Sequence, residues 1–118
     1  MTRELHARTM VLIVAGLGLL PIGGAGLAQG VAFTKEYLGD AGRIELGRTV
    51  WVTRCQFCHG KAAYPGKAPK LDPSRYTPEF VFDRVTNGFQ GMPGWKHEFS
   101  EDERRAVVAY VMSKDFSN

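Results

Sequence analysis

The chain has 118 residues, 15 Lys+Arg against 12 Asp+Glu, a formal net charge of +3 and a hydrophobic content of 44%. So small a basic surplus, with no basic tract, is not the electrostatic footprint of a nucleic-acid-binding protein. The length fits one small domain, and a domain of this size buries only a modest share of its surface. Its own apolar core is therefore expected to be marginal.

The N-terminal segment has the features of a secretory signal peptide. Arg3 and Arg8 give it a basic start, and an uncharged apolar stretch follows at residues 10–20. Proline and glycines then interrupt the stretch, and small residues before and at Ala28 offer a cleavage site. The pattern predicts export from the cytoplasm.

We predict that residues 1–28 are a cleaved signal peptide and that residues 29–118 form the mature domain in the periplasm. An uncleaved membrane anchor is the alternative, because no charge appears between Met10 and Gln29. That stretch is rich in glycine and lies near the lower limit of about 17 to 25 residues for a spanning helix. In both cases the cysteines lie outside the cytoplasm.

The first half of the mature chain reads as a lead-in, a helix and a loop. Residues 29–39 are expected to be extended, and Asp40 is a suitable N-cap for a helix that continues to Arg54. Residues 60–76 contain repeated proline and glycine, which exclude a long helix there.

The second half contains two more expected helices. Thr77 followed by Pro78 is typical of a helix start, and Asn87-Gly88 of its end. A loop at residues 88–99 precedes a capping box at residues 100–103, which opens the last helix. With no hairpin signal, the predicted class is all-α, with three main helices and long loops wrapped around something large.

The sequence Cys55-Gln56-Phe57-Cys58-His59 has the CxxCH spacing at which a c-type haem is attached. Both thiols can bond covalently to haem vinyl groups, and the adjacent histidine is then held beneath the iron as an axial ligand. A haem would also supply the apolar volume that so small a domain lacks. We therefore predict one covalently attached haem c per chain on Cys55 and Cys58, with His59 as an iron ligand.

The two cysteines could instead form a zinc site, a redox-active pair or a structural disulfide. A closed zinc site usually needs four Cys or His ligands, and His6 and His97 are the only other histidines in a chain without a third cysteine. A thioredoxin-like pair needs a βαβ setting, and no strand-like run lies near Cys55. A structural disulfide stays open for two cysteines in an exported protein.

Several motifs together resemble the class I (monohaem) c-type cytochromes of the bacterial periplasm. Gly47, eight residues before Cys55, matches the family's glycine at the crossing of the first and last helices. Trp51 and Tyr110 match the aromatic residues that pack in the same crossing. The resemblance covers essentially the whole mature domain and implies the small cytochrome c fold.

The resemblance also implies the second axial ligand. Met92, in the sequence Gly-Met-Pro-Gly-Trp before the last helix, lies where the family places its axial methionine. His97 is the serious alternative, since imidazole binds iron well, but it lacks the motif context. Met112 lies in the last helix and is a weaker candidate, and an open site is the remaining alternative.

Two further residues have expected places around the haem. Pro69, with Leu71, resembles the family's proline whose carbonyl accepts the Nδ1 hydrogen of the axial histidine, a bond that fixes the tautomer. Trp95 is expected at the haem edge, either packing there or donating to a propionate. Other propionate candidates are weaker and comprise Arg75, Tyr76 and Arg84.

The predicted function is single-electron transfer between periplasmic redox proteins, without enzymatic activity, small-molecule substrate or nucleic acid. The partners implied are a dehydrogenase or a membrane respiratory complex. Lysines near the haem motifs could steer an acidic partner and comprise Lys61, Lys67, Lys70 and Lys96. One alternative is a dedicated subunit of a larger dehydrogenase or reductase, with residues 31–38 as a possible contact. A ligand-binding haem enzyme or sensor is another.

Overall fold

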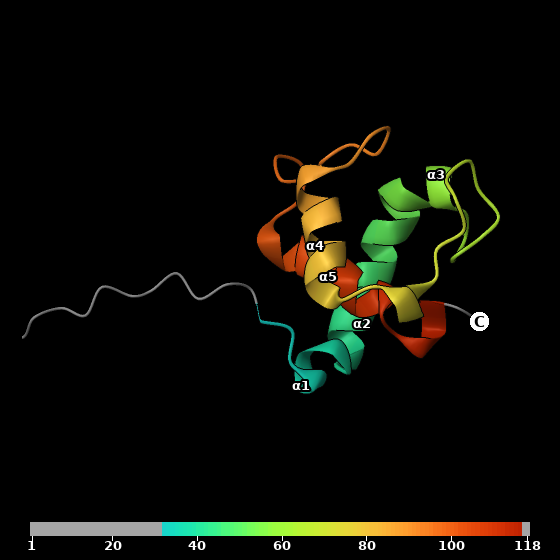
Figure 1. The fold of residues 1–118 in the computed structure, drawn as a ribbon. Helices are drawn as coiled ribbons and strands as arrows, with labels where there is room; N and C mark the ends of the chain where they lie inside the picture. Colours follow the sequence, from blue (N-terminus) through green and yellow to red (C-terminus); the bar gives the residue numbers. More distant parts are fainter. Residues whose placement is uncertain (1–31, 117–118) are drawn as a thin grey trace, which may run out of the picture.

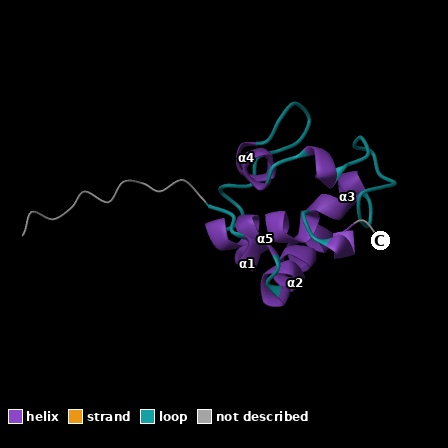
Figure 2. Cartoon of the chain, turned by 60° about the horizontal axis from the view of Figure 1, so that its bottom comes forward, coloured by secondary structure: helices purple, strands orange, loops and turns teal. Residues whose placement is uncertain are grey.

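The computed structural model describes residues 32–116, and the helical class predicted from the sequence is confirmed (Figures 1 and 2). The predicted signal peptide lies outside the described residues. Within residues 32–116 there is no β-strand, only an isolated bridge between Phe89 and Met92. The elements in chain order are α1 (Lys35–Leu38), α2 (Ala41–Val50), the π-helical segment η1 (Trp51–Cys55), α3 (Gln56–His59), the 3₁₀ turn η2 (Pro73–Arg75), α4 (Pro78–Asn87), α5 (Glu101–Val111) and the 3₁₀ turn η3 (Lys114–Phe116).

The predicted caps begin the three main helices. The Asp40 carboxylate accepts the Arg43 amide at 2.8 Å at the start of α2. Thr77 caps α4 in the same way, and Ser100 forms a reciprocal capping box at the start of α5. Each side-chain oxygen satisfies a backbone N–H that has no partner within its own helix.

The extended lead-in predicted for residues 29–39 is wrong over residues 35–38, which form α1. The Thr34 hydroxyl accepts the Tyr37 amide at 3.1 Å, and the Gly39 amide donates to the Lys35 carbonyl at 2.9 Å. These two bonds close one helical turn, which is too short to leave a periodic apolar pattern.

The helix predicted from Asp40 to Arg54 changes character near its end. Regular α-helix stops at Val50, and the wider π turn of η1 follows, with the Gln56 amide donating to the Trp51 carbonyl. The hydroxyl of Thr49 donates to the Glu45 carbonyl at 3.1 Å, and that of Thr53 donates to the Thr49 carbonyl at 2.8 Å. Such bonds compete with the helical ladder and bend helices, so they favour a local change of pitch beside the CxxCH motif.

The core forms where α2 crosses α5. A Cβ on Gly47 would lie 2.0 Å from the Ala106 carbonyl oxygen, so the two helix backbones touch at this point. The Trp51 ring packs edge-on against Tyr110 and Phe116, with centroids 6.1 and 4.7 Å away. The crossing inferred from Gly47, Trp51 and Tyr110 is therefore confirmed, and α4 packs on another side of α5.

The N-terminal segment of the described chain packs back onto α5. The Arg105 guanidinium lies over the rings of Phe33 and Tyr37, at 5.3 and 4.6 Å from their centroids, and donates to the Ala32 carbonyl at 3.0 Å. Of the helices described between residues 32 and 116, none has the length and apolar character needed to span a membrane.

Candidate haem-binding site

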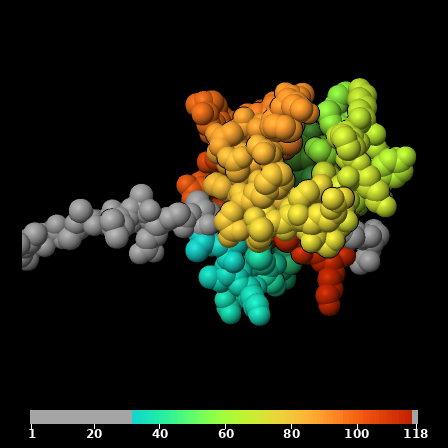
Figure 3. Space-filling view, viewed as in Figure 1, coloured from blue at the N-terminus to red at the C-terminus, as the bar shows by residue number. Residues whose placement is uncertain are grey.

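A cavity of about 1150 Å³ separates the CxxCH segment from α4. Figure 3 shows the surface hollowed between the orange-yellow helix α4 and the green segment around α3. The walls come from η1 and α3, from the loop at residues 67–71, from α4, from the loop at residues 89–95 and from α5. Segments far apart in sequence therefore enclose one space.

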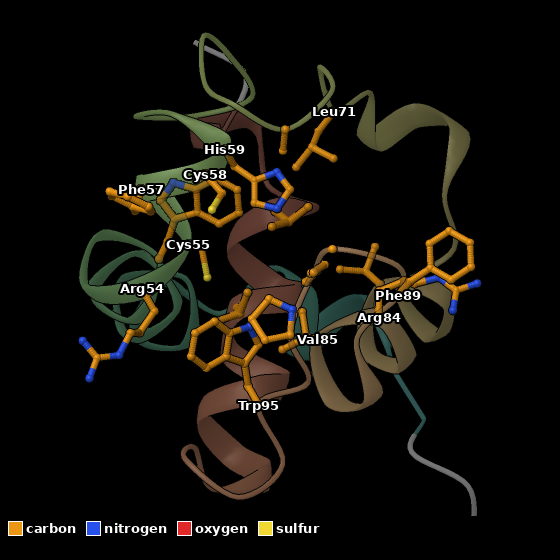
Figure 4. A pocket seen from close by; sticks show the side chains of 18 of the residues that line it. Arg54, Cys55, Phe57, Cys58, His59, Leu71, Arg84, Val85, Phe89 and Trp95 are labelled. Carbon is orange, nitrogen blue, oxygen red and sulfur yellow. The ribbon is translucent and has the colours of Figure 1, made fainter.

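Both cysteines and the histidine of the motif line this cavity (Figure 4). Cys55 is buried and Cys58 is exposed, and both are free thiols. The structural disulfide that the sequence left open is therefore absent. In Figure 4 the His59 imidazole extends from the end of α3 into the cavity.

The backbone that carries His59 is fixed by its surroundings. Gly60 ends α3 with φ +86°, a conformation that residues with a Cβ rarely adopt. The Ala68 amide donates to the Cys58 carbonyl at 2.7 Å, which ties the following loop to the motif. The Trp51 indole donates to the Gly60 carbonyl at 3.1 Å.

Burial controls the protonation of the motif. It raises the pKa of the Cys55 thiol to about 11, with the neighbouring Cys58 as a second cause. Burial also lowers the pKa of His59, which favours the neutral imidazole. The neutral form is the one that coordinates a metal ion.

The Nδ1 atom of His59 is buried and has no hydrogen-bond partner. The predicted bond to the Pro69 carbonyl is thus not formed in this structure, although Pro69 and Leu71 both line the cavity. Pro69 as the acceptor stays a prediction. A buried polar atom without a partner costs free energy, so a shift of the loop that brings an acceptor such as the Pro69 carbonyl to Nδ1 would stabilise the imidazole.

Met92 lines the same cavity from a restrained loop. Phe89 and Met92 exchange two backbone hydrogen bonds, of 3.0 and 2.9 Å, and the Trp95 amide donates to the Val85 carbonyl at 2.9 Å. The loop is therefore anchored to the end of α4, and Met92 is half-buried. Neither competing ligand is in this position, since His97 is exposed and both His97 and Met112 lie outside the cavity lining.

The other predicted residues divide between the cavity and the surface. Trp95 lines the cavity, as Figure 4 shows, and its ring packs 5.7 Å from that of Phe99. Of the other propionate candidates and the lysines suggested for a partner, the cavity lining includes Tyr76, Arg84 and Lys67. It does not include Arg75, Lys61, Lys70 or Lys96. The basic residues suggested for a partner therefore do not form one group at the cavity.

Sequence reasoning missed most of the apolar lining. Val81 and Val85 of α4, and Val107 and Val111 of α5, line the cavity with helical i,i+4 spacing. That spacing was a readable signal of one helix face. Arg54 was also missed, and it lies at the cavity with its guanidinium paired to the Glu98 carboxylate.

These residues fit a covalently attached haem. The cavity offers two thiols and a neutral imidazole from one segment, a thioether from another, and a lining made mainly of apolar side chains. Groups of three or more His, Cys, Asp and Glu able to hold a bare metal ion are absent from the described part of the chain. The donor set therefore suits a large apolar group that brings its own iron.

Comparison with known proteins gives the same result. A family model described as "Cytochrome C oxidase, cbb3-type, subunit III" matches residues 42–111. Cytochrome c6 of Bryopsis maxima is 30% identical over 79 residues, which cover 59% of this chain and 90% of that protein.

Two solved structures share the fold. Cytochrome CL of the marine methylotrophic bacterium Methylophaga aminisulfidivorans MPT superposes with a TM-score of 0.57 and 22% identity, over 73% of this chain and 69% of that one. The c-type cytochrome NirC superposes with a TM-score of 0.51 and 27% identity, over 62% of this chain and 92% of that one.

The helical fold and the CxxCH cavity define a class I c-type cytochrome. The chain belongs to the cytochrome c family described as cbb3-type cytochrome c oxidase subunit III, since that family model matches more than half of its residues. Membership implies covalently bound haem c and an electron-transfer function, in agreement with the sequence analysis.

Proposed function

We propose that the chain carries single electrons between redox proteins of the periplasm, with one haem c attached to Cys55 and Cys58 and its iron ligated by His59 and Met92. The observation that supports this is the shared cavity. Met92 lines the same cavity as the CxxCH motif, whereas His97 lies outside the cavity lining. When bound, the haem supplies an iron that alternates between Fe(III) and Fe(II).

The protein's own groups set the conditions for this exchange. A thioether is a soft ligand, and His/Met ligation raises the reduction potential. The apolar side chains around the cavity limit water access and lower the local dielectric, which also affects the potential. The paired backbone bonds of the Met92 loop leave it little freedom to rearrange, which suits fast electron transfer.

Export and the cleavage of residues 1–28 belong to the same proposal. The basic start and apolar stretch of the N-terminus support them. Mass spectrometry of the protein purified with detergent from whole bacterial cells gives a direct measurement. We expect the mass of residues 29–118 plus one haem, whereas a mass that includes residues 1–28 would mean that the anchor is retained.

The optical spectrum of the oxidised holoprotein tests the axial ligands. We expect a weak far-red charge-transfer band from a methionine–ferric iron bond, lost in Met92→Ala and kept in the matched control Met112→Ala. A low-spin spectrum without the band would favour His97. A high-spin spectrum, together with rapid binding of carbon monoxide by the reduced protein, would favour a ligand-binding sensor or enzyme.

A dedicated subunit of a larger oxidoreductase is the second candidate, which the description of the family model favours. The contact once suggested at residues 31–38 has less support, because Phe33 and Tyr37 pack against Arg105 of the same chain. Size-exclusion chromatography of the protein from its natural source tests this candidate. A stable complex would support the subunit, and an isolated monomer would support the mobile carrier.

A further inference from the structure

We propose that Trp51 is a positioning residue for His59, acting through a hydrogen bond from its indole N–H to the carbonyl of Gly60. The proposal rests on His59 as an iron ligand. The Trp51 side chain is 3% exposed, and its Nε1 atom lies 3.1 Å from the Gly60 oxygen. Its ring also lies 5.5 Å from the imidazole of His59, at an interplanar angle of 38°.

This bond acts on the Gly60–Lys61 peptide unit, one residue beyond the ligand. The Gly60 amide already donates to the Gln56 carbonyl at 2.9 Å, so the last turn of α3 is held from one side. The Trp51 bond fixes the Gly60 carbonyl as well. Together the two bonds restrain the backbone immediately after His59 and therefore the direction in which its imidazole leaves the helix.

The surrounding loop makes this restraint effective. A Cβ on Gly60 would lie 2.0 Å from the Pro65 carbonyl oxygen, so the chain folds back tightly against this peptide. The bond is buried, and leaving the buried carbonyl without a partner would cost free energy. The Gly60 peptide would therefore reorient to find another partner if the indole N–H were removed.

The positioning role is separable from the packing role of the same residue. The Trp51 ring contacts Tyr110 and Phe116 at the α2–α5 crossing. Phenylalanine at position 51 keeps an aromatic ring in that cluster but has no N–H to donate. Tyr110→Phe is the matched control, because Tyr110 belongs to the same aromatic cluster but does not line the cavity.

Resonance Raman spectroscopy of the reduced holoprotein tests the proposal. In Met92→Ala the open iron position makes the iron–histidine stretching band observable. Adding Trp51→Phe is expected to shift this band to lower frequency and broaden it, whereas adding Tyr110→Phe leaves it unchanged. The positioning role would be overturned if the band had the same frequency in Met92→Ala and in both double variants. It would also be overturned if the band shifted equally in the two double variants.

The same experiment separates this proposal from the function on which it rests. If reduced Met92→Ala is high-spin and five-coordinate but has no iron–histidine band, ligation by His59 is wrong and the positioning role falls with it. A second measurement needs no variant, namely hydrogen exchange of the Trp51 indole N–H in the unaltered holoprotein. We expect exchange at least about tenfold slower than in the unfolded chain, and equal rates would contradict the hydrogen bond.

Discussion

At Gly47 the absence of a side chain determines how closely two helices approach. The position that a Cβ would take is 2.5 Å from the Ala106 carbonyl carbon and 2.8 Å from the Tyr110 Cβ. The nearest atoms belong to backbone, which cannot rotate away as the end of a flexible side chain can. At this position the room for a close α2–α5 crossing therefore matters more than the better helix propensity that a larger residue would have.

Gly47→Ala is expected to lower the free energy of unfolding by about 2 kcal/mol. Overpacking of this kind costs about 1 to 3 kcal/mol, and the cost at Gly47 should lie near the upper end because the new Cβ would meet backbone atoms. Alanine has a helix propensity about 1 kcal/mol more favourable than glycine, which offsets part of this cost. Urea unfolding of the holoprotein measures the change. Gly42→Ala, in the exposed first turn of the same helix, is the control and should leave the free energy of unfolding unchanged or raise it by up to about 1 kcal/mol. Equal stability of the two variants would contradict the close crossing.

The helix that carries most of the core, α5, begins with a reciprocal cap. The Glu103 amide donates to the Ser100 hydroxyl at 3.2 Å, and the Ser100 amide donates to the Glu103 carboxylate at 2.8 Å. The backbone bond from Ser100, followed by the bond from its hydroxyl, lowers the pKa of Glu103 below the ordinary value of 4.5. The start of α5 is therefore sensitive to acid.

Glu103→Gln is expected to lower the free energy of unfolding at pH 7 by about 0.5 kcal/mol, because it removes a charged acceptor near a helix N-terminus. A carboxyl whose pKa is lowered by folding stabilises the protein above its unfolded pKa, and the contribution is lost as the pH falls through the folded pKa. The difference between variant and parent should therefore shrink below about pH 4. Urea unfolding across this pH range measures it, with the exposed Glu101→Gln as control. A difference independent of pH would contradict the cap.

Signals that lie next to each other in the sequence predicted the elements well. The caps at Asp40, Thr77 and Ser100 placed the starts of three helices because each cap bonds to an amide within the next turn. The π turn at Trp51–Cys55 was missed, since the threonine hydroxyls that favour it also fit an ordinary helix. The single turn α1 was missed because four residues are too few for a period.

The site divides in the same way. CxxCH is a local motif and could be read directly, and Met92 followed from a resemblance in its loop. The pairing of Arg54 with Glu98 joins residues 44 apart, and no local pattern marks such a contact. The predicted bond from His59 to Pro69 depended on the path of an irregular loop, and local patterns do not determine where its carbonyl groups point.

At the scale of the whole molecule, the chain has a solid part and a hollow part. Residues 106–111 of α5 are all buried, mainly where α5 meets α2. In α4 only Val85 is buried, although Phe80 and Val81 also line the cavity. The apolar sides of α4 and of the Met92 loop therefore surround a space that side chains do not fill.

Removal of the haem should consequently loosen one part of the fold more than the other. We expect a Cys55→Ser/Cys58→Ser double variant, which cannot attach haem, to lose at least about tenfold of its amide hydrogen-exchange protection in α4 and residues 88–99. Protection in α2 and α5 should fall less, because the contact at Gly47 and the Trp51, Tyr110 and Phe116 cluster do not require the cavity to be filled. Hydrogen exchange followed by mass spectrometry measures both regions.

Met92→Ala is the control for this comparison, because it loses an iron ligand but keeps the covalent haem and should retain protection in α4. A uniform loss across all helices in the double variant would show that the haem stabilises the α2–α5 crossing as strongly as it does α4. Full protection would show that the cavity persists without it. The expected intermediate result would mean that α2 and α5 form a preassembled support for the CxxCH segment, while α4 and the Met92 loop are ordered by closing over the haem.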